Sequence, residues 1–409
     1  MFMSSMLRQC TVNVFIAYVG AILAIVASPL LGQEAAKPAF GKLKYIDLIV
    51  SPELDSVNSV IVDKQGKFLY ASSWNGNTVN VLSRDAVTGK LTLVQAMNSP
   101  RDLDGVTSIH LSEDGMYGVS AAFRAKATVL FKRDLATGRL EFLDVARSGE
   151  KGVQGMEWAI DATFSLDHRF VFVADPKGPG MSNPNSPKNN GGIVVFEVTD
   201  KERLKWVETN IGEEDCFHGV RGIMMLPDGK TLVATCNNAG NVVLIDWDKN
   251  ARKTSIRQVI TDEKTRATAL AGAMKSVSSS DGSTLYVTSG RFQGDNAVSV
   301  FRLNKDGQAT FLQQMVDNKA LTDFVGGNQL SLSPDQRNLY AAATRSGSLA
   351  CFERDLKTGE LTYIETLSND ATGFLNGACG VCVSPDGNHV YVTAEGNNSI
   401  AVFERNTVR

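Results

Sequence analysis

Hydrophobic and polar residues alternate in short runs along most of the chain, and tight turns separate the runs. The clearest example is residues 381–405, which read VCVSPDGNHVYVTAEGNNSIAVFER. The turn at 384–387 is Ser-Pro-Asp-Gly, in which proline sets φ and glycine tolerates a left-handed conformation. The turn at 396–398, Gly-Asn-Asn, also contains residues that tolerate positive φ. A two-residue period predicts β-strands, so this segment predicts a meander of three antiparallel strands.

The same pattern recurs seven times, roughly every 50 residues. The residues aligned at the first turn of successive copies are Lys64, Glu113, Leu166, Pro227, Ser280, Pro334 and Pro385. In most copies a fourth β-type run follows a turn that ends in glycine, as at 88–89 and 358–359. Four short strands in each of seven copies, without a long helical pattern, predict an all-β fold. We therefore expect a seven-bladed β-propeller of four-stranded antiparallel blades.

The two ends of the repeat array complement each other. The seventh copy stops at Arg409 and lacks a fourth strand, whereas residues 41–47, GKLKYID, copy the fourth-strand sequence GELTYIE of 359–365. An N-terminal strand that completes the last blade removes the unpaired edges of an open ring. The sequence therefore predicts that this strand closes the ring and that 41–409 form the propeller domain.

Residues 1–32 have the layout of a secretory signal peptide. They carry one charged residue, Arg8, then an apolar run over 12–27 and small residues before a polar Gln-Glu at 33–34. The alternative is a retained N-terminal membrane anchor, because the apolar run approaches the length that spans a bilayer. We expect cleavage, a linker at 33–40, and a periplasmic or secreted protein that does not contact the membrane after cleavage.

Charge and cysteine content limit the range of functions. The formal net charge is −3 and there are no runs of lysine or arginine, so the composition does not favour nucleic-acid binding. Cys379 and Cys382 have a CxxC spacing, but without the second pair of a zinc site or the histidine of a haem site. The repeat instead places them on an innermost strand as small buried residues. We expect no metal, no cofactor and a monomer.

One face of the propeller concentrates the irregular residues. In an antiparallel four-stranded blade, the turns between the second and third strands share a face with the links between blades. Here those turns and links differ from copy to copy, and 175–192 is a long Pro-, Gly- and Asn-rich insertion in blade 3. Because ligand sites are concave and carry convergent polar groups, we place the binding site over the central channel on this face.

The innermost strands and this face supply cations and amides that packing alone does not explain. Arg221, Lys275 and Asn328 lie five or six residues before the aligned turn position, where other copies have Ile, Met or Cys. Guanidinium and ammonium groups hold anions by charge-assisted hydrogen bonds. The predicted substrate-binding residues are Arg221, Lys275, Arg291, Glu395 and Asn328.

Three residues are candidates for proton transfer: His218, Glu157 and Asp161. An imidazole can move a proton near neutral pH, and either carboxylate could position His218 or act as the base itself. The alternative is that these carboxylates form buried ion pairs with Arg221 that fill the channel. By its alternation, His110 lies in a strand interior and is expected to be structural.

Units of the form V-SPDG-x-x-x-YVT-x-x-x-NN-x-I-x-VFERD-x-x-TG-x-L resemble the seven-bladed propeller lactonase family, which includes bacterial 6-phosphogluconolactonases and fungal carboxymuconate-lactonising enzymes. The resemblance covers 41–409 and implies chemistry by His, Arg and Glu side chains near the channel. It implies a 6-phosphogluconolactonase-like protein that hydrolyses or forms a carboxylated or phosphorylated sugar-type lactone, and the segment 1–32 adds the expectation that this protein is exported. The alternative is a non-catalytic exported propeller that binds a protein, a glycan or a small ligand over the same channel.

Overall fold

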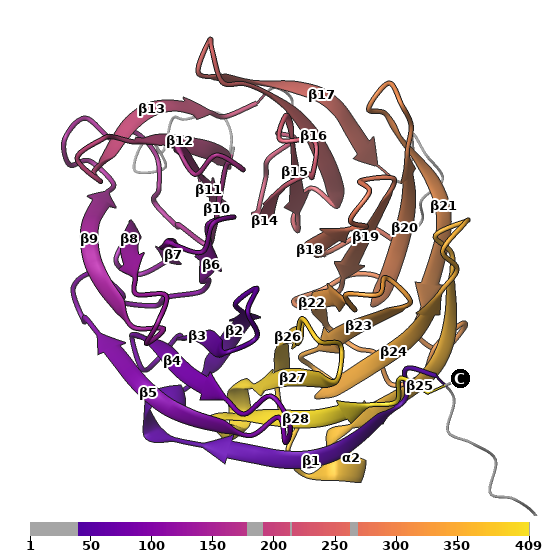
Figure 1. Cartoon of the computed structure of the whole chain (residues 1–409). Coiled ribbons are helices and arrows are strands. Elements are labelled where there is room, and N and C mark those ends of the chain that lie inside the picture. Colours follow the sequence, from indigo (N-terminus) through magenta and orange to yellow (C-terminus); the bar gives the residue numbers. More distant parts are fainter. Residues whose placement is uncertain (1–39, 178–190, 213–214, 262–268, 409) are drawn as a thin grey trace, which may run out of the picture. The chain divides into compact units, whose positions relative to one another are not determined.

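A computed structural model describes residues 40–177, 191–212, 215–261 and 269–408. These belong to the compact unit Pro38–Arg409, and they form seven four-stranded antiparallel sheets around a central channel (Figure 1). The predicted seven-bladed propeller is confirmed. The expected signal segment, 1–32, and the linker up to residue 39 lie outside the described residues. No helix in the described part of the chain is long and apolar enough to cross a membrane.

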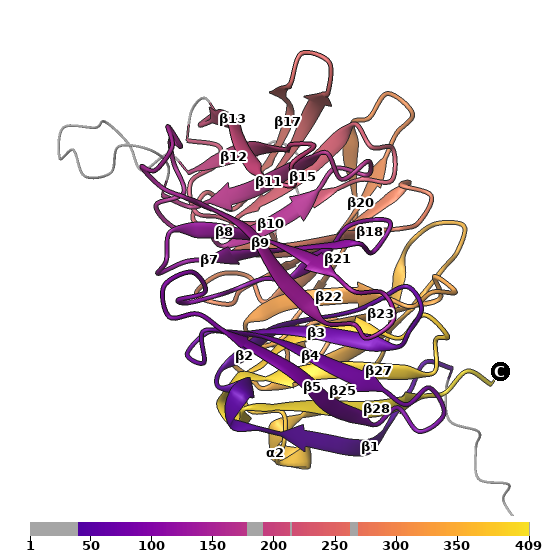
Figure 2. The same ribbon diagram turned by 60° about the vertical axis from the view of Figure 1, so that its left-hand side comes forward.

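The first six blades each take four strands in chain order from the channel outward. Blade 1 consists of β2 (Val57–Val62), β3 (Phe68–Ser73), β4 (Thr78–Arg84) and β5 (Leu91–Asn98). Blade 2 consists of β6 (His110–Leu111), β7 (Tyr117–Ala122), β8 (Ala127–Arg133) and β9 (Leu140–Arg147). Blade 3 consists of β10 (Asp161–Phe164), β11 (Phe170–Asp175), β12 (Gly192–Val198) and β13 (Leu204–Asn210). Blade 4 consists of β14 (Val220–Met225), β15 (Thr231–Cys236), β16 (Asn241–Asp248) and β17 (Lys253–Thr261). Blade 5 consists of β18 (Ala273–Ser278), β19 (Thr284–Ser289), β20 (Ala297–Leu303) and β21 (Ala309–Val316). Blade 6 consists of β22 (Gly327–Leu332), β23 (Asn338–Ala343), β24 (Ser348–Arg354) and β25 (Leu361–Ser368). Successive strands run in opposite directions, so successive turns alternate between the two faces of the ring (Figure 2).

Blade 7 joins the two ends of the described chain. It consists of β26 (Ala378–Val383), β27 (His389–Ala394), β28 (Ser399–Arg405) and β1 (Leu43–Val50), with the short helical segments η1 (Pro52–Leu54), α2 (Asn369–Thr372) and η2 (Glu395–Asn397) in nearby connections. The Leu43 amide donates to Glu365 Oε1 of blade 6 at 3.0 Å, just as the Leu361 amide donates to Gln313 Oε1 of blade 5 at 2.7 Å. The N-terminal strand therefore makes the same contact as an ordinary fourth strand, which confirms the predicted ring closure.

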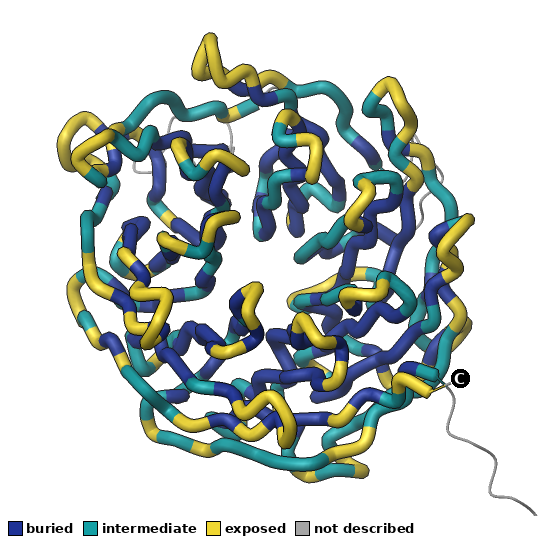
Figure 3. The backbone as a smooth tube through the Cα atoms, in the orientation of Figure 1, coloured by how far each residue is buried: buried dark blue, intermediate teal, exposed yellow. Residues whose placement is uncertain are grey.

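The hydrophobic core lies between neighbouring blades, because each sheet is apolar on both faces. The second strand of blade 3, β11, is buried along its whole length. Its Phe172 packs with side chains of blade 4, whereas Val171 and Val173 pack with those of blade 2. Figure 3 shows buried strands within the blades and exposed residues mainly at the turns. One strand thus stabilises two blade boundaries through its alternating side chains.

A hydrogen-bonded clamp joins blades 7 and 1. The Tyr391 hydroxyl accepts from Arg84 Nε at 2.7 Å and donates to the Gly89 carbonyl at 3.0 Å. Asp386 accepts from the same guanidinium at 2.6 Å. The pattern repeats at three further boundaries, in the sets Tyr70–Arg133–Gly138, Tyr286–Arg354–Gly359 and Tyr340–Arg405–Gly41.

The clamp between blades 6 and 7 also anchors the N-terminal segment. Gly41, whose carbonyl accepts from Tyr340, has a φ of +85°, and a Cβ there would lie 2.0 Å from Asn338 Nδ2. Only glycine fits this position. Between blades 3 and 4, aromatic packing occupies the place of the clamp, since Trp247 meets the rings of Phe170 and Phe172 edge-on at 4.8 and 4.9 Å.

We expect Arg133→Ala to lower the free energy of unfolding strongly. Arg133 and Asp63 form a salt bridge in which both side chains are 1% exposed, so the substitution leaves an uncompensated buried carboxylate. Removing one partner of such a pair costs about 3–5 kcal/mol. Urea unfolding followed by circular dichroism measures the change. Arg302→Ala, which removes an exposed arginine on β20, is the matched control and should change stability by less than about 0.5 kcal/mol; equal losses in the two variants would contradict the clamp's contribution.

Candidate functional site

The innermost strands begin irregularly, and this directs polar side chains into the channel. The register shifts between Val57 and Ser59 in β2 and between Val220 and Gly222 in β14, with similar shifts in β18, β22 and β26. The residue at the shift in β14 is Arg221. A bulge breaks the strict alternation of side chains and re-aims them. For this reason two consecutive positions of one strand can both line the channel.

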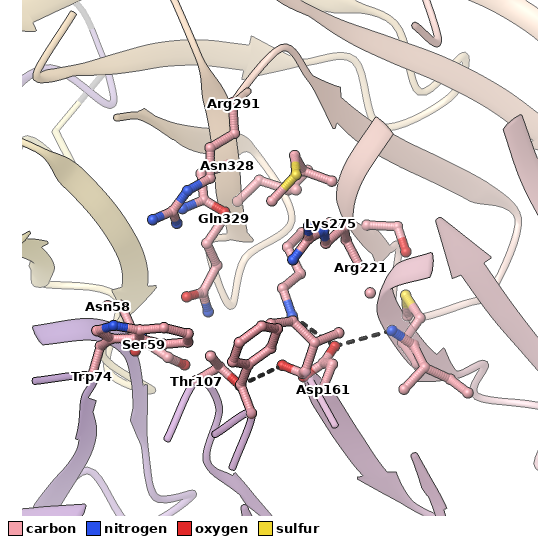
Figure 4. A pocket seen from close by; sticks show the side chains of 18 of the residues that line it. Asn58, Ser59, Trp74, Thr107, Asp161, Arg221, Lys275, Arg291, Asn328 and Gln329 are labelled. Atoms are coloured by element: carbon pink, nitrogen blue, oxygen red, sulfur yellow. Dashed lines mark hydrogen bonds and ion pairs between the residues drawn. The ribbon is translucent and has the colours of Figure 1, made fainter. Parts of the chain in front are cut away.

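These strands surround a cavity of about 520 Å³ in the channel (Figure 4). Six of the residues predicted from the sequence line it: Asp161, Arg221, Lys275, Arg291, Asn328 and Glu395. They come from blades 3 to 7, so residues far apart in the chain share one space. The remaining polar lining consists of side chains that can donate or accept hydrogen bonds, among them Asn58, Ser59, Thr107 and Gln329.

Glu157 and His218 do not line this cavity. Glu157 accepts hydrogen bonds from Lys126 Nζ at 2.7 Å and from Ser148 Oγ at 2.9 Å. Burial favours a higher pKa for Glu157, but these two contacts outweigh it and lower the pKa. His218 lines a neighbouring depression, and its Nε2 lies 3.4 Å from Asn238 Nδ2. The structure therefore does not bring the three predicted proton-transfer residues together.

Asp161 holds several parts of the cavity together. Its side chain, 2% exposed, accepts from Lys275 Nζ at 2.7 Å and from the Ile223 amide at 3.0 Å. Its second oxygen lies 3.1 Å from His110 Nε2. Burial acts to raise the pKa of Asp161, but the Lys275 charge and the contact with His110 outweigh it and hold the pKa below its usual range. Figure 4 shows Lys275 extended toward Asp161.

The structure places His110 in the cavity, a position that the alternation pattern did not indicate. Its side chain is 33% exposed and lines the same space as Arg221. The strand that carries it, β6, is only two residues long. Its position in the repeat could have predicted this placement. His110 lies three residues before the aligned turn position, and Asp161 lies five residues before it. Positions two residues apart on a strand share a face, so the two align toward the channel.

Two guanidinium groups lie beside the ring of Phe292. The Cζ atoms of Arg221 and Arg291 lie 4.8 and 5.6 Å from the ring centroid, within cation–π range. Arg291 donates to Glu395 Oε2 at 2.8 Å. Arg221 forms no salt bridge with a described residue, and its Nε is buried without a hydrogen-bond partner. Burial and the neighbouring charge of Arg291 lower the pKa of Arg221 to about 10, which leaves it charged at neutral pH.

An aromatic wall, made of Trp74, Phe123 and Trp158, lines another part of the cavity. The Phe123 ring centroid lies 5.2 Å from that of Trp74 and 5.2 Å from that of Trp158. The three residues come from turns and links of blades 1 to 3. Trp158 remains 36% exposed, so part of its ring is available to a ligand.

The two cysteines with the CxxC spacing lie on an innermost strand, as predicted. Cys379 and Cys382 are buried in β26, and Cys379 Sγ accepts from Arg291 and Asn328 at 2.8 and 2.7 Å. No group of three or more His, Cys, Asp or Glu side chains in the described ranges could hold a metal ion. The insertion of blade 3 connects β11 to β12 as expected, but its residues 178–190 lie outside the described ones.

Solved structures with low sequence identity share this fold. The periplasmic gluconolactonase PpgL of Pseudomonas aeruginosa is 19% identical, with a TM-score of 0.64 over 80% of this chain and 88% of that chain. A candidate 6-phosphogluconolactonase of Bacteroides fragilis is 18% identical, with a TM-score of 0.64 over 86% and 91%. The β-propeller domain of Cps50 (Swd1) from Myceliophteria thermophila is 15% identical, with a TM-score of 0.62 over 89% and 99%. At these identities the likeness shows the fold alone.

Sequence comparison identifies the family. The profile described as "Lactonase, 7-bladed beta-propeller" matches residues 36–154 and 248–372, which is more than half of the chain. A search of curated proteins finds no match. The chain therefore belongs to the seven-bladed β-propeller lactonase family.

Proposed function

We propose that this protein is a lactonase that hydrolyses a small anionic, sugar-type lactone in the channel cavity. The observation that carries the proposal is Arg221, a charged guanidinium in that cavity whose Nε has no hydrogen-bond partner among the described residues. An unsatisfied charged group that is removed from water is costly, so a site that retains one is suited to an anionic ligand. The other lining cations, Lys275 and Arg291, already have carboxylate partners.

The form of the cationic group favours a carboxylate or a phosphate. A guanidinium presents a planar fork of donors that matches two oxygens of either anion. The guanidinium Cζ of Arg221 lies 4.8 Å from the centroid of the Phe292 ring, a cation–π contact that helps to hold the fork in place. The lining contains three cationic side chains, Arg221, Lys275 and Arg291, and two anionic ones, Asp161 and Glu395. This excess of one positive charge supports binding of a singly or doubly charged ligand.

The rest of the cavity suits a hydroxylated ring. Its volume of about 520 Å³ lies within the range of small-molecule sites, which runs to roughly 1,000 Å³. Asn58, Thr107 and Gln329 offer hydrogen bonds to hydroxyl groups, and the aromatic wall offers a flat apolar surface for one face of the ring. Membership of the lactonase family and the names of the Pseudomonas and Bacteroides proteins support gluconolactone or its 6-phosphate as the substrate class.

We also propose that the protein acts in the periplasm or outside the cell. The support is the apolar, sparsely charged segment 1–32, with its small residues before the polar positions 33–34. The Pseudomonas protein with the same fold is periplasmic by name. A substrate at that location would be a lactone present outside the cytoplasm.

We expect Arg221→Ala to impair hydrolysis of charged lactones selectively. Hydrogen bonds to a charged group contribute about 1.5–3 kcal/mol, so kcat/KM for glucono-lactone 6-phosphate should fall by about 10- to 100-fold. Uncharged gluconolactone should be affected much less, because it lacks the group that Arg221 binds. Initial rates of hydrolysis above the spontaneous rate, measured for these lactones and a muconolactone, test this.

The control for that experiment is Arg345→Ala. Arg345 is an exposed arginine in the turn between β23 and β24, on the same face as the cavity but outside its lining. Equal losses for charged and uncharged lactones in Arg221→Ala would argue against an anion site. No turnover of any lactone by the unsubstituted protein would reject the lactonase proposal and favour a propeller that only binds its ligand.

We expect ligand binding to change tryptophan fluorescence. Two of the four tryptophans, Trp74 and Trp158, line the cavity, and a bound ring would remove water from them. Titration with gluconate 6-phosphate, the hydrolysis product, should shift the emission to shorter wavelength, and the double variant Trp74→Phe/Trp158→Phe should lose most of the shift. Trp206→Phe, in the outer strand β13, should retain it. A shift that survives in the double variant would place the ligand elsewhere.

A further inference from the structure

The cavity contains a histidine–carboxylate pair whose arrangement suits proton transfer. His110 Nε2 lies 3.1 Å from Asp161 Oδ1, and both side chains line the cavity. Their strands, β6 and β10, are the innermost strands of blades 2 and 3. The pair therefore forms across a blade boundary, on the same channel surface that presents Arg221 on β14.

Asp161 is itself a poor proton acceptor. Its carboxylate is 2% exposed and accepts hydrogen bonds from the Lys275 ammonium, the His110 ring and the Ile223 amide. Bonds of this kind stabilise the ionised form, and they occupy three of the roughly four lone-pair directions of the carboxylate. Glu395, the other carboxylate in the described lining, is held by Arg291 at 2.8 Å. These arrangements leave the imidazole of His110 as the basic group of the cavity.

Asp161 also selects which nitrogen of His110 is basic. A carboxylate that accepts the proton on Nε2 fixes the tautomer in which Nδ1 carries the lone pair. No hydrogen-bond partner of Nδ1 occurs among the described residues, and the ring is 33% exposed to the cavity. The charged and titratable groups around it are Asp161 on β10, Lys275 on β18 and Arg221 on β14, with Arg291 and Glu395 in the turns at the channel mouth.

We propose that His110 is the general base of lactone hydrolysis and that Asp161 is its positioning residue, an inference that rests on the proposed lactonase function. His110 Nδ1 takes a proton from water as the water oxygen bonds to the lactone carbonyl carbon. Lys275 Nζ donates a hydrogen bond to the resulting oxyanion. The bond from that carbon to the ring oxygen then breaks, and the imidazolium returns the proton to the ring oxygen. Water and lactone thus yield one hydroxy acid.

The positions of these groups along the channel determine the orientation in which the substrate would bind. Arg221 and Thr107 both lie six residues before the aligned turn position of their copies, whereas His110 lies three residues before it. His110 therefore lies further along the innermost segment of its blade, away from the channel mouth at which that segment begins. The anionic end of the substrate would bind near the mouth, at Arg221, with the lactone carbonyl directed inward to His110 and Lys275.

The test compares His110→Gln, His110→Ala and Asp161→Asn with the unsubstituted protein. Removing a general base typically costs 10²- to 10⁴-fold in rate, so we expect a loss of this size in kcat for both His110 variants. Added imidazole should restore part of the activity of His110→Ala. The acid limb of the kcat/KM profile against pH should disappear in His110→Gln. Calorimetric affinity for gluconate 6-phosphate should change less than threefold, because Arg221 binds the anion.

Asp161→Asn should leave kcat reduced and shift the acid limb, because the histidine loses the group that fixes its tautomer. The matched control is His168→Gln, which breaks another His–Asp contact, between His168 Nδ1 and Asp114 at 3.2 Å, at a surface turn outside the cavity. It should leave the rate and its pH profile unchanged. Circular dichroism checks that each variant is folded.

The outcomes separate this inference from the proposed function. Turnover by the unsubstituted protein that persists, with its acid limb, in His110→Gln would overturn the inference and leave the lactonase function standing. Collapse of activity in His218→Gln with retention in His110→Gln would assign the base to His218 and overturn it equally. No turnover by the unsubstituted protein, with binding of gluconate 6-phosphate intact, would reject the lactonase function and this inference with it.

Discussion

The structure depends on the contact between neighbouring blades, because no blade can cover its own two apolar faces. The clamp at the boundary of blades 7 and 1 fixes the relative register of the two sheets. Its central hydroxyl, on Tyr391, bonds both to Arg84 on the third strand of the next blade and to the Gly89 carbonyl in the following turn. The same hydroxyl geometry, through Tyr340, holds Gly41 before the closing strand. Ring closure therefore uses the contacts that join ordinary blades.

A ring held firmly between its blades can accommodate irregular backbone and an unpaired charge at its centre. The bulges at the starts of the innermost strands interrupt ladder hydrogen bonds, and each directs side chains into the channel. Arg221 combines such a bulge with a buried Nε that no described residue satisfies. Local costs of this kind are typical of functional sites, where the surrounding packing maintains an arrangement that is unfavourable by itself. The cavity is thus specialised at the expense of local stability.

The fold does not specify the chemistry, since propellers with the same architecture serve unrelated functions. The chemistry that we propose divides the cavity into two parts. In the proposed function, Arg221, beside Phe292, binds the anion near the mouth, and the His110–Asp161 pair transfers the proton further along the channel. Lys275 lines the same cavity and forms a salt bridge with Asp161. This arrangement relates family membership to a specific set of side chains.

The sequence by itself determined the seven-bladed fold, the closing strand and six of the residues that line the cavity. Strand period, turn residues and the copy of 359–365 at 41–47 are local signals, and the repeat aligns equivalent positions such as Arg221 and Asn328. Only the tertiary structure decided which charges meet. His110 reaches Asp161 across a blade boundary, whereas Glu157 is held by Lys126 outside the cavity. Such pairings depend on distances between blades, and the order of residues along the chain does not encode these distances directly.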